Sequence, residues 1–132
     1  MKVYTSYFAN SANLRKQGIV MIGIALYPPK WFDGKSVKLV APSYDILKNS
    51  TSTENYVERF KTEILAKRNA KQFFEAIEFI GQGKDVALCC FEKPNEFCHR
   101  HLVAEWLKEQ LGLEVEEFGI SHNPQYRQGD LF

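Results

Sequence analysis

The stretch that decides the fold is VALCCFEKPNEFCHR, residues 86–100. Its first six residues, 86–91, form an apolar run of strand length, with glycines before it and Pro94 after it. Apolar side chains then recur at helical spacing over residues 102–111, and Gly112 is a typical helix end. The stretch therefore predicts a buried strand whose carboxyl end leads through a short polar turn into a helix.

All three cysteines of the chain lie in this stretch, near the predicted junction of strand and helix. In open α/β sheets ligands usually bind at that edge, and helix N-termini attract anions. With Asn95 as the N-cap, Cys98 falls in the first helical turn, where the helix dipole and nearby Arg100 favour the thiolate. His99 continues the buried stripe of the helix and is expected to point inward. The pattern predicts an activated thiol with a base beside it.

A thiol-dependent active site is the first interpretation of this cluster. In it, Cys98 or Cys90 attacks the substrate and His99 shuttles a proton. The guanidinium of Arg100 and the helix N-terminus hold a phosphate or carboxylate, while Glu92 orients the imidazole or the guanidinium. The predicted catalytic residues are Cys90, Glu92, Cys98, His99 and Arg100.

Polar and aromatic side chains also lie near the ends of two earlier predicted strands. Residues 2–8 are rich in β-branched and aromatic residues, and residues 19–27 form an almost continuous apolar run that a Pro-Pro pair stops. Because carboxyl ends of parallel strands share one edge, we predict ligand-binding residues there. They are Ser6, Asn10, Tyr27 and Trp31. For the two aromatic side chains, the alternative is that they cap the core.

A metal site is the second interpretation. Its ligands would be Cys90, Cys98 and His99, with His101 or His122 completing the set. However, the chain lacks the paired Cys-x-x-Cys spacing typical of zinc sites, and adjacent ligands are difficult to aim at one ion. We therefore predict no metal and no cofactor.

A purely structural role is the third interpretation. In it, His99 bonds a buried backbone group, Arg100 pairs with Glu92 or Glu96, and the thiols fill space. Against it stands the concentration of Cys, His, Arg and Glu at one junction, because burying such groups costs desolvation free energy without an obvious structural need.

Several segments resemble the Domain of Unknown Function 488 family. The central motif is CFEKP at residues 90–94 followed by FCHRHLVAEWL at residues 97–107. TSYFAN at residues 5–10 and ALYPPKWF at residues 25–32 are similar to the N-terminal motifs of one branch of that family. The resemblance spans most of the chain and implies family membership, but it names no reaction.

Composition and charge narrow the class of protein. The chain has 132 residues, of which 45% are hydrophobic and 25% charged, as in one ordinary globular domain. Seventeen basic and sixteen acidic side chains produce no net field that would attract nucleic acid from a distance. Three cysteines, two of them adjacent, make a poor disulfide framework and suit a reducing compartment. With no signal-peptide pattern or apolar run of membrane length, we expect a cytoplasmic protein that does not bind membranes.

The remaining segments predict further elements. Residues 15–16 are expected in a loop, and residues 37–40 in a short edge strand. Thr51 and Glu54 fit a capping box at the start of an amphipathic helix. A second helix is expected to open at residues 69–70. Along the strand predicted at residues 86–91, alternation places Cys89 and Cys90 on opposite faces, so Cys89 is expected in the core.

The order of these elements predicts the fold class. Residues 113–118 read as a final strand, so strands alternate with helices along the chain. Parallel neighbours need crossover helices, which predicts a three-layer α/β fold: a mainly parallel sheet with helices on both faces. We predict a single small domain at residues 1–120 and a flexible tail at residues 121–132.

The end of the chain, QGDLF at residues 128–132, resembles the pentapeptide by which many bacterial replication and repair proteins bind the sliding clamp. The usual form is Gln-Leu-Ser/Asp-Leu-Phe, and here Gly129 replaces the first Leu. Two apolar anchors on a flexible end are a typical low-area docking mode, although the pair could instead fold back on the domain. The predicted partner-binding residues are Gln128, Asp130, Leu131 and Phe132.

Together these observations leave two classes of function open. The first is a thiol-dependent enzyme or ligand-binding domain whose substrate is anionic: a nucleotide, a nucleic-acid end, or a small phosphate or carboxylate. The second is a non-enzymatic adaptor of DNA maintenance that docks on the sliding clamp. A metal-binding domain is a further alternative.

Overall fold

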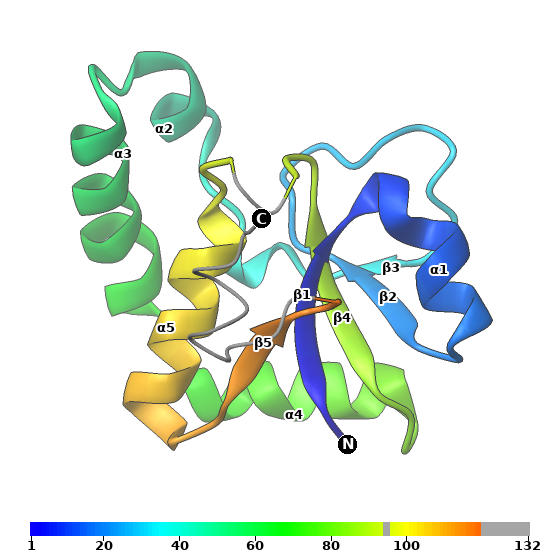
Figure 1. Cartoon of the computed structure of the whole chain (residues 1–132). Coiled ribbons are helices and arrows are strands. Elements are labelled where there is room, and N and C mark those ends of the chain that lie inside the picture. Colours follow the sequence, from blue (N-terminus) through cyan, green and yellow to red (C-terminus); the bar gives the residue numbers. More distant parts are fainter. Residues whose placement is uncertain (94–95, 120–132) are drawn as a thin grey trace, which may run out of the picture.

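One parallel sheet forms the centre of the molecule (Figure 1). The computed structural model describes residues 1–93 and 96–119. Within them, five strands pair in the order β3-β2-β4-β1-β5, and every pairing is parallel. The strands are β1 Val3–Tyr7, β2 Val20–Gly23, β3 Lys35–Ser36, β4 Val86–Cys90 and β5 Val115–Glu117.

The central strand is β4, which contains most of the buried apolar run predicted at residues 86–91. It pairs with β1 on one side, from Val3 opposite Val86 to Tyr7 opposite Cys90, and with β2 on the other. All five residues of β4 are buried. Strands buried on both faces lose alternation and become continuously apolar, which explains its sequence.

Helices cover both faces of the sheet, so the predicted three-layer α/β fold is confirmed. On one face, α4 (Ala70–Gly81) and α5 (His99–Leu111) pack on Val86 and Leu88 of β4. The helical segment from α3 (Thr53–Arg59) to residue 67 joins the same layer (Figure 1). The opposite face carries α1 (Ser11–Lys16), whose Leu14 packs among Ala87 and neighbouring side chains.

The connections leaving β1 and β4 diverge to opposite faces. From Tyr7 the chain continues to α1 on one face, whereas from Cys90 it continues to α5 on the other. These two strand ends are register partners in neighbouring strands. Such a divergence opens a crevice at the carboxyl edge of an α/β sheet, where ligands typically bind.

Three predicted segments differ from the structure. Residues 15–16 belong to α1, whose only buried residue is Leu14, so its sequence has no detectable apolar period. Residues 38–40 form a 3₁₀ turn rather than the predicted edge strand. The edge strand is β3 at Lys35–Ser36, and Val40 is buried in the core beneath the helices. The long run at residues 19–27 contains the strand β2, but pairing ends at Gly23 while the chain stays buried through Ala25.

Helix ends match the predictions more closely. Asn69 caps α4 by accepting the N–H of Gln72, and Gly112 ends α5 in the left-handed conformation, with φ 66°. The cap of α3 is Ser52 rather than Thr51, and α2 (Tyr44–Asn49) is capped by Ser43, which accepts the N–H of Ile46. No helix in the described part of the chain is long and apolar enough to cross a membrane.

Candidate thiol site at the carboxyl edge of the sheet

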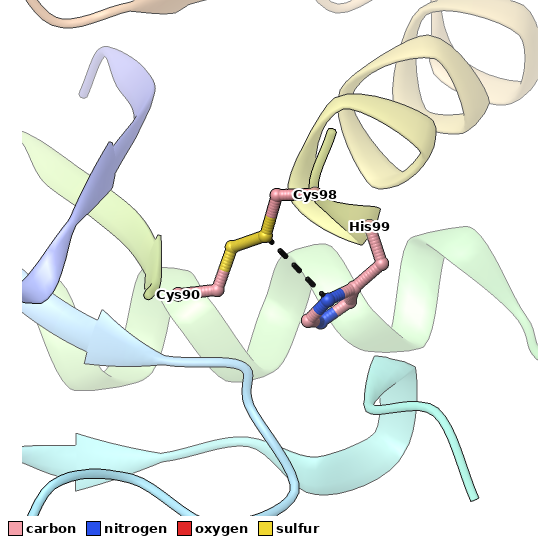
Figure 2. Close-up of side chains that lie close together, drawn as sticks. All are labelled: Cys90, Cys98 and His99. Atoms are coloured by element: carbon pink, nitrogen blue, oxygen red, sulfur yellow. Dashed lines mark hydrogen bonds between the residues drawn. A yellow bond between two sulfur atoms is a disulfide. The ribbon is translucent and has the colours of Figure 1, made fainter. Parts of the chain in front are cut away.

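Two of the three cysteines meet at the end of the central strand. Cys90 is the last residue of β4, Cys98 directly precedes α5, and their sulfur atoms are joined in a disulfide (Figure 2). The sequence-based expectation of a poor disulfide framework therefore misses this pair. Cys89 is free and buried in the core, as predicted, and its burial raises the pKa of its thiol to about 12.

The N-cap of α5 is Cys98, not Asn95, which lies outside the described residues. Cys98 has an extended backbone, with φ −152° and ψ 145°, and the helix begins at His99. This change of conformation turns two side chains that are adjacent in sequence toward each other. Cys98 Sγ and His99 Nδ1 are 3.8 Å apart (Figure 2).

The imidazole of His99 is held in one tautomer. Its Nε2 lies 2.8 Å from the carbonyl oxygen of Ile24, and because a carbonyl can only accept, Nε2 carries the proton. The Nδ1 lone pair is left facing Cys98. His99 is only 5% exposed and its ring packs edge-on against Phe60. Burial lowers the pKa of His99 to about 4, so the ring is neutral at physiological pH.

Arg100 contacts the sulfur of Cys90 and is completely buried. Its guanidinium binds both oxygens of Glu117 at 3.0 Å and donates from Nη1 to Cys90 Sγ at 3.1 Å. Thr5 also donates to Glu117, at 2.6 Å. The partner of Arg100 is thus Glu117 of β5, and the predicted pairing with Glu92 or Glu96 is wrong. This geometry favours tuning of Cys90 rather than the predicted contact with a substrate anion.

A cavity of about 290 Å³ opens next to the cysteines. Cys90, Cys98 and His99 contribute to its wall, and Glu92 is the one carboxylate among the lining side chains. Most of the remaining wall is apolar or aromatic, with contributions from Leu26, Tyr27, Pro42, Leu47, Tyr56, Phe91 and Phe97. The cavity therefore combines a small reactive corner with a large apolar surface, which is the usual composition of a small-molecule site.

Of the predicted ligand-binding residues, the structure brings only Tyr27 to this cavity. Ser6 is fully buried in β1, where its hydroxyl accepts a hydrogen bond from Asn10 at 3.1 Å. Trp31 packs edge-on against Phe8 and is 56% exposed. Ser6, Asn10 and Trp31 are not among the residues that line the cavity.

Two important residues were missed by the sequence analysis. Tyr56 of α3 lines the cavity and packs edge-on against Phe97, with ring centroids 5.1 Å apart. Burial, with a smaller contribution from Glu92, raises its pKa well above the ordinary value. Tyr56 belongs to an apolar helical stripe, so it looked like core. Glu117 was missed as well, although an acidic residue inside a short strand pattern is a signal of a buried partner.

The cluster also meets the geometric requirement for a metal ion. The ligand atoms of Cys90, Cys98 and His99 all lie within 4.8 Å of one another, and all three residues are buried. The objection that adjacent ligands diverge does not apply here, because Cys98 is extended and His99 helical. His101 is not part of this group, and His122 lies outside the described residues.

Fold and site together define a small parallel α/β domain with a cysteine-histidine cluster beside an apolar cavity at the carboxyl edge of its sheet. The chain belongs to the domain of unknown function 488 family: its model described as "Active DUF488-N3 subclade" matches residues 6–111. The match includes the whole cluster and ends before Glu117. Neither the comparison with curated proteins nor that with solved structures finds a match.

Proposed function

We propose that the chain is a thiol-dependent enzyme that acts on a ligand held in the apolar cavity. The observation that carries this proposal is the pair of Cys98 Sγ and His99 Nδ1, 3.8 Å apart at the cavity wall. The active form is reduced: a two-electron reductant, such as a small thiol, breaks the Sγ–Sγ bond and each sulfur takes up a proton. The oxidised small thiol is released as its own disulfide.

In the reduced form, Cys98 is the nucleophile and His99 the base. As the sulfur bonds to an electrophilic carbon, its proton passes to Nδ1, and the leaving group departs with the bonding electron pair. The Ile24 carbonyl accepts from Nε2–H and holds the imidazolium, which then returns the proton to the leaving group. Water then hydrolyses the bond between the Cys98 sulfur and the substrate carbon, which releases the product and restores the thiol. Because the pKa of His99 is about 4, the imidazole does not ionise the thiol in advance, and proton transfer accompanies attack.

Cys90 is assigned the second thiol of the site. Its sulfur accepts a hydrogen bond from Arg100, whose guanidinium is paired with Glu117. When Cys98 carries a mixed disulfide with a small thiol, a thiolate in this position can attack Cys98 Sγ; the small thiol leaves with the bonding electron pair and the Cys90–Cys98 disulfide is restored. The two groups that Glu92 is predicted to orient are engaged elsewhere, because His99 bonds to the Ile24 carbonyl and Arg100 to Glu117. Glu92 therefore enters the proposal only as a carboxylate that lines the cavity.

The walls of the cavity bear on the predicted class of substrate. Arg100 is engaged by Glu117, so the anion-binding element that remains is the N-terminus of α5. Tyr27, Tyr56 and Phe97 offer aromatic surface to a ligand. Within the predicted anionic substrates, this combination favours nucleotides, whose planar base suits aromatic walls, over small phosphates and carboxylates.

Alkylation of the reduced protein, followed residue by residue with mass spectrometry across a pH series, tests the proposal. We expect the pH dependence of alkylation at Cys98 to differ from that of a free cysteine. His99→Ala should change the pH dependence of the alkylation rate of Cys98 and leave that of Cys90 unchanged. Cys98→Ser must abolish any covalent adduct formed with an electrophilic nucleotide analogue, whereas Cys89→Ala must retain it. If both thiols behave like free cysteine in the wild type, the nucleophile assignment is refuted.

The adaptor function remains a second candidate, supported by the sequence of residues 128–132. Those residues lie outside the described part of the chain, so the geometry of the cavity neither requires nor opposes it. A clamp-docked domain would place the thiol site near DNA without a basic patch of its own.

A further inference from the structure

The three ligand atoms at the site have the chemistry and spacing of a zinc centre. Zinc binds thiolate sulfur at about 2.3 Å and imidazole nitrogen at about 2.0 Å, so ligand atoms of a tetrahedron lie roughly 3.5–3.8 Å apart. Cys98 Sγ and His99 Nδ1 already stand 3.8 Å apart. The whole set, with Cys90 Sγ, falls within 4.8 Å.

The backbone positions of the two cysteines suit two ligands of one ion. Their Cα atoms are 7.2 Å apart, just beyond the spacing of about 4.4–6.8 Å that is usual for disulfides. When the Sγ–Sγ bond is reduced, the two sulfur atoms can separate around an ion without requiring their strand and helix to move closer. Cys90 ends the central strand and Cys98 is the N-cap of α5, so both attachment points adjoin regular structure.

Groups around the cluster hydrogen-bond to its side chains and orient them, as the groups that surround the ligands of a metal site do. A metal-binding histidine usually donates its second N–H to a carbonyl or carboxylate, which fixes the tautomer. Here the Nε2–H of His99 bonds to the Ile24 carbonyl at 2.8 Å and directs the Nδ1 lone pair toward the sulfur atoms. Arg100 donates to Cys90 Sγ at 3.1 Å, as donors to metal-bound thiolates do.

Charge is balanced in such a centre. Two thiolates neutralise a divalent cation, and the buried Arg100 is already neutralised by Glu117 at 3.0 Å. A buried site without net charge avoids the desolvation penalty of an uncompensated ion. The two sulfurs and the imidazole are soft or borderline ligands, which select zinc over magnesium or calcium.

We propose that the reduced protein binds one zinc ion through Cys90 Sγ, Cys98 Sγ and His99 Nδ1, with the fourth position open to the apolar cavity. Reduction by a thiol or phosphine supplies two electrons and leaves two protonated sulfurs. Binding of Zn²⁺ then releases both protons. Three protein ligands with an open fourth position are the arrangement of catalytic rather than structural zinc sites.

The proposal goes beyond the thiol mechanism, because an ion on Cys98 engages the lone pair that would attack a substrate. Zinc-bound and free-thiol forms are therefore exclusive states of the same site. In the bound form, zinc supplies a Lewis acid at the cavity wall, to which an oxygen or nitrogen of the cavity ligand can bind.

Metal titration of the full-length chain, prepared without a histidine tag and reduced with a phosphine under anaerobic conditions, tests the proposal. Zinc affinity is measured by competition with a chromophoric chelator, and Co²⁺ serves as a spectroscopic probe. We expect one ion per chain, thiolate-to-cobalt charge-transfer absorption and the visible bands of tetrahedral cobalt. Cys90→Ser, Cys98→Ser and His99→Ala should each weaken zinc binding by at least roughly 100-fold. Cys89→Ala, which changes a free buried thiol outside the cluster, should leave it unchanged.

Three further measurements separate loss of zinc binding from loss of folding. Circular dichroism establishes that each variant is folded, and zinc should protect both cluster thiols of the wild type from alkylation and raise its melting temperature. Wild-type affinity no higher than that of Cys90→Ser and Cys98→Ser, or cobalt spectra without thiolate bands, would overturn the zinc site. The thiol mechanism is judged separately by its adduct on Cys98 in chelator-treated protein, so the two proposals can fail independently.

Discussion

The backbone of Cys98 decides how the candidate site is arranged at the scale of single residues. In a helix, consecutive side chains point about 100° apart, and Cys98 within the first turn would diverge from His99. An extended N-cap removes that constraint, so sulfur and imidazole converge at 3.8 Å. The sequence identifies both residues, but an error of three positions in the helix start changes what they can do together.

Burial of His99 predicts a pH-dependent stability. Its pKa is about 4 in the folded protein, below the ordinary value of about 6.5 expected for the unfolded chain. Above pH 6.5 both states are neutral and the full stability is present. As the pH falls from 6.5 toward 4, the unfolded chain binds the proton first, and the free energy of unfolding should drop by about 3 kcal/mol.

Urea unfolding of metal-free protein over this pH range measures the effect, with His99→Gln as the comparison. His101, whose pKa is also lowered by burial, and the carboxylates contribute to the slope in both proteins. The informative quantity is therefore the difference in slope. Parallel pH profiles for wild type and variant would contradict the assignment of a buried neutral imidazole.

Helix caps provide a test at the scale of elements. The hydroxyl of Ser52 accepts the N–H of Asn55 at 3.0 Å, whereas Thr51 contributes only its own backbone N–H, to the Asn55 side chain. Ser52→Ala should therefore lower the free energy of unfolding by about 1 kcal/mol, the usual value of an N-cap. Thr51→Ala should change it by less than about half of that. Equal losses in denaturant titrations would favour the cap at Thr51.

The buried pair of Arg100 in α5 and Glu117 in β5 joins two consecutive elements of the chain. Glu117→Gln leaves a guanidinium uncompensated in the core, and such a change should destabilise the protein by about 3 kcal/mol or more. The exposed pair Lys108–Glu114 connects the same two regions, with 3.4 Å between nitrogen and oxygen. Glu114→Gln should therefore cost less than about 1 kcal/mol.

Thermal and urea unfolding of Glu117→Gln and Glu114→Gln measure this difference directly. The Glu117 variant should also alter the alkylation rate of Cys90, because Arg100 would be freed to act on the sulfur alone. Similar stabilities for the two variants would mean that the buried pair contributes little to folding.

At the scale of the whole molecule, sheet order explains why the cluster and the cavity coincide. The central position of β4 and the divergence of its connection from that of β1 bring Cys90 to the crevice at the carboxyl edge. The predicted alternation of strands and helices is sufficient to expect a crevice of this kind. It is not sufficient to tell which side chains line it.

Clamp binding by residues 128–132 is a prediction that concerns the whole molecule. Immobilised sliding clamp should capture the full-length protein and lose the variant that lacks residues 128–132. Leu131→Ala combined with Phe132→Ala should have the same effect, because these are the two apolar anchors. Thiol alkylation of the truncated form should be unchanged, which separates docking from the site. Equal capture of intact and shortened protein would end the adaptor hypothesis.

The sequence by itself determined the fold class, the buried strand at residues 86–90, the start of α4, the C-terminal end of α5, and the residues of the cysteine-histidine cluster. Those features depend on local periodicity, on capping residues and on short motifs, all of which are readable over ten to twenty residues. Short elements such as α1 and β3 escaped because too few of their residues are buried to create a period.

Only the tertiary structure decided the partners of the cluster. The Ile24 carbonyl lies 75 positions from His99, and Glu117 lies 17 positions from Arg100. Tyr56 reaches the cavity from a helix whose apolar stripe looks like ordinary core. A buried polar group must find a partner, but which distant atom meets that need depends on how strands and helices pack. That information belongs to the sheet order and the crossover connections rather than to any single segment.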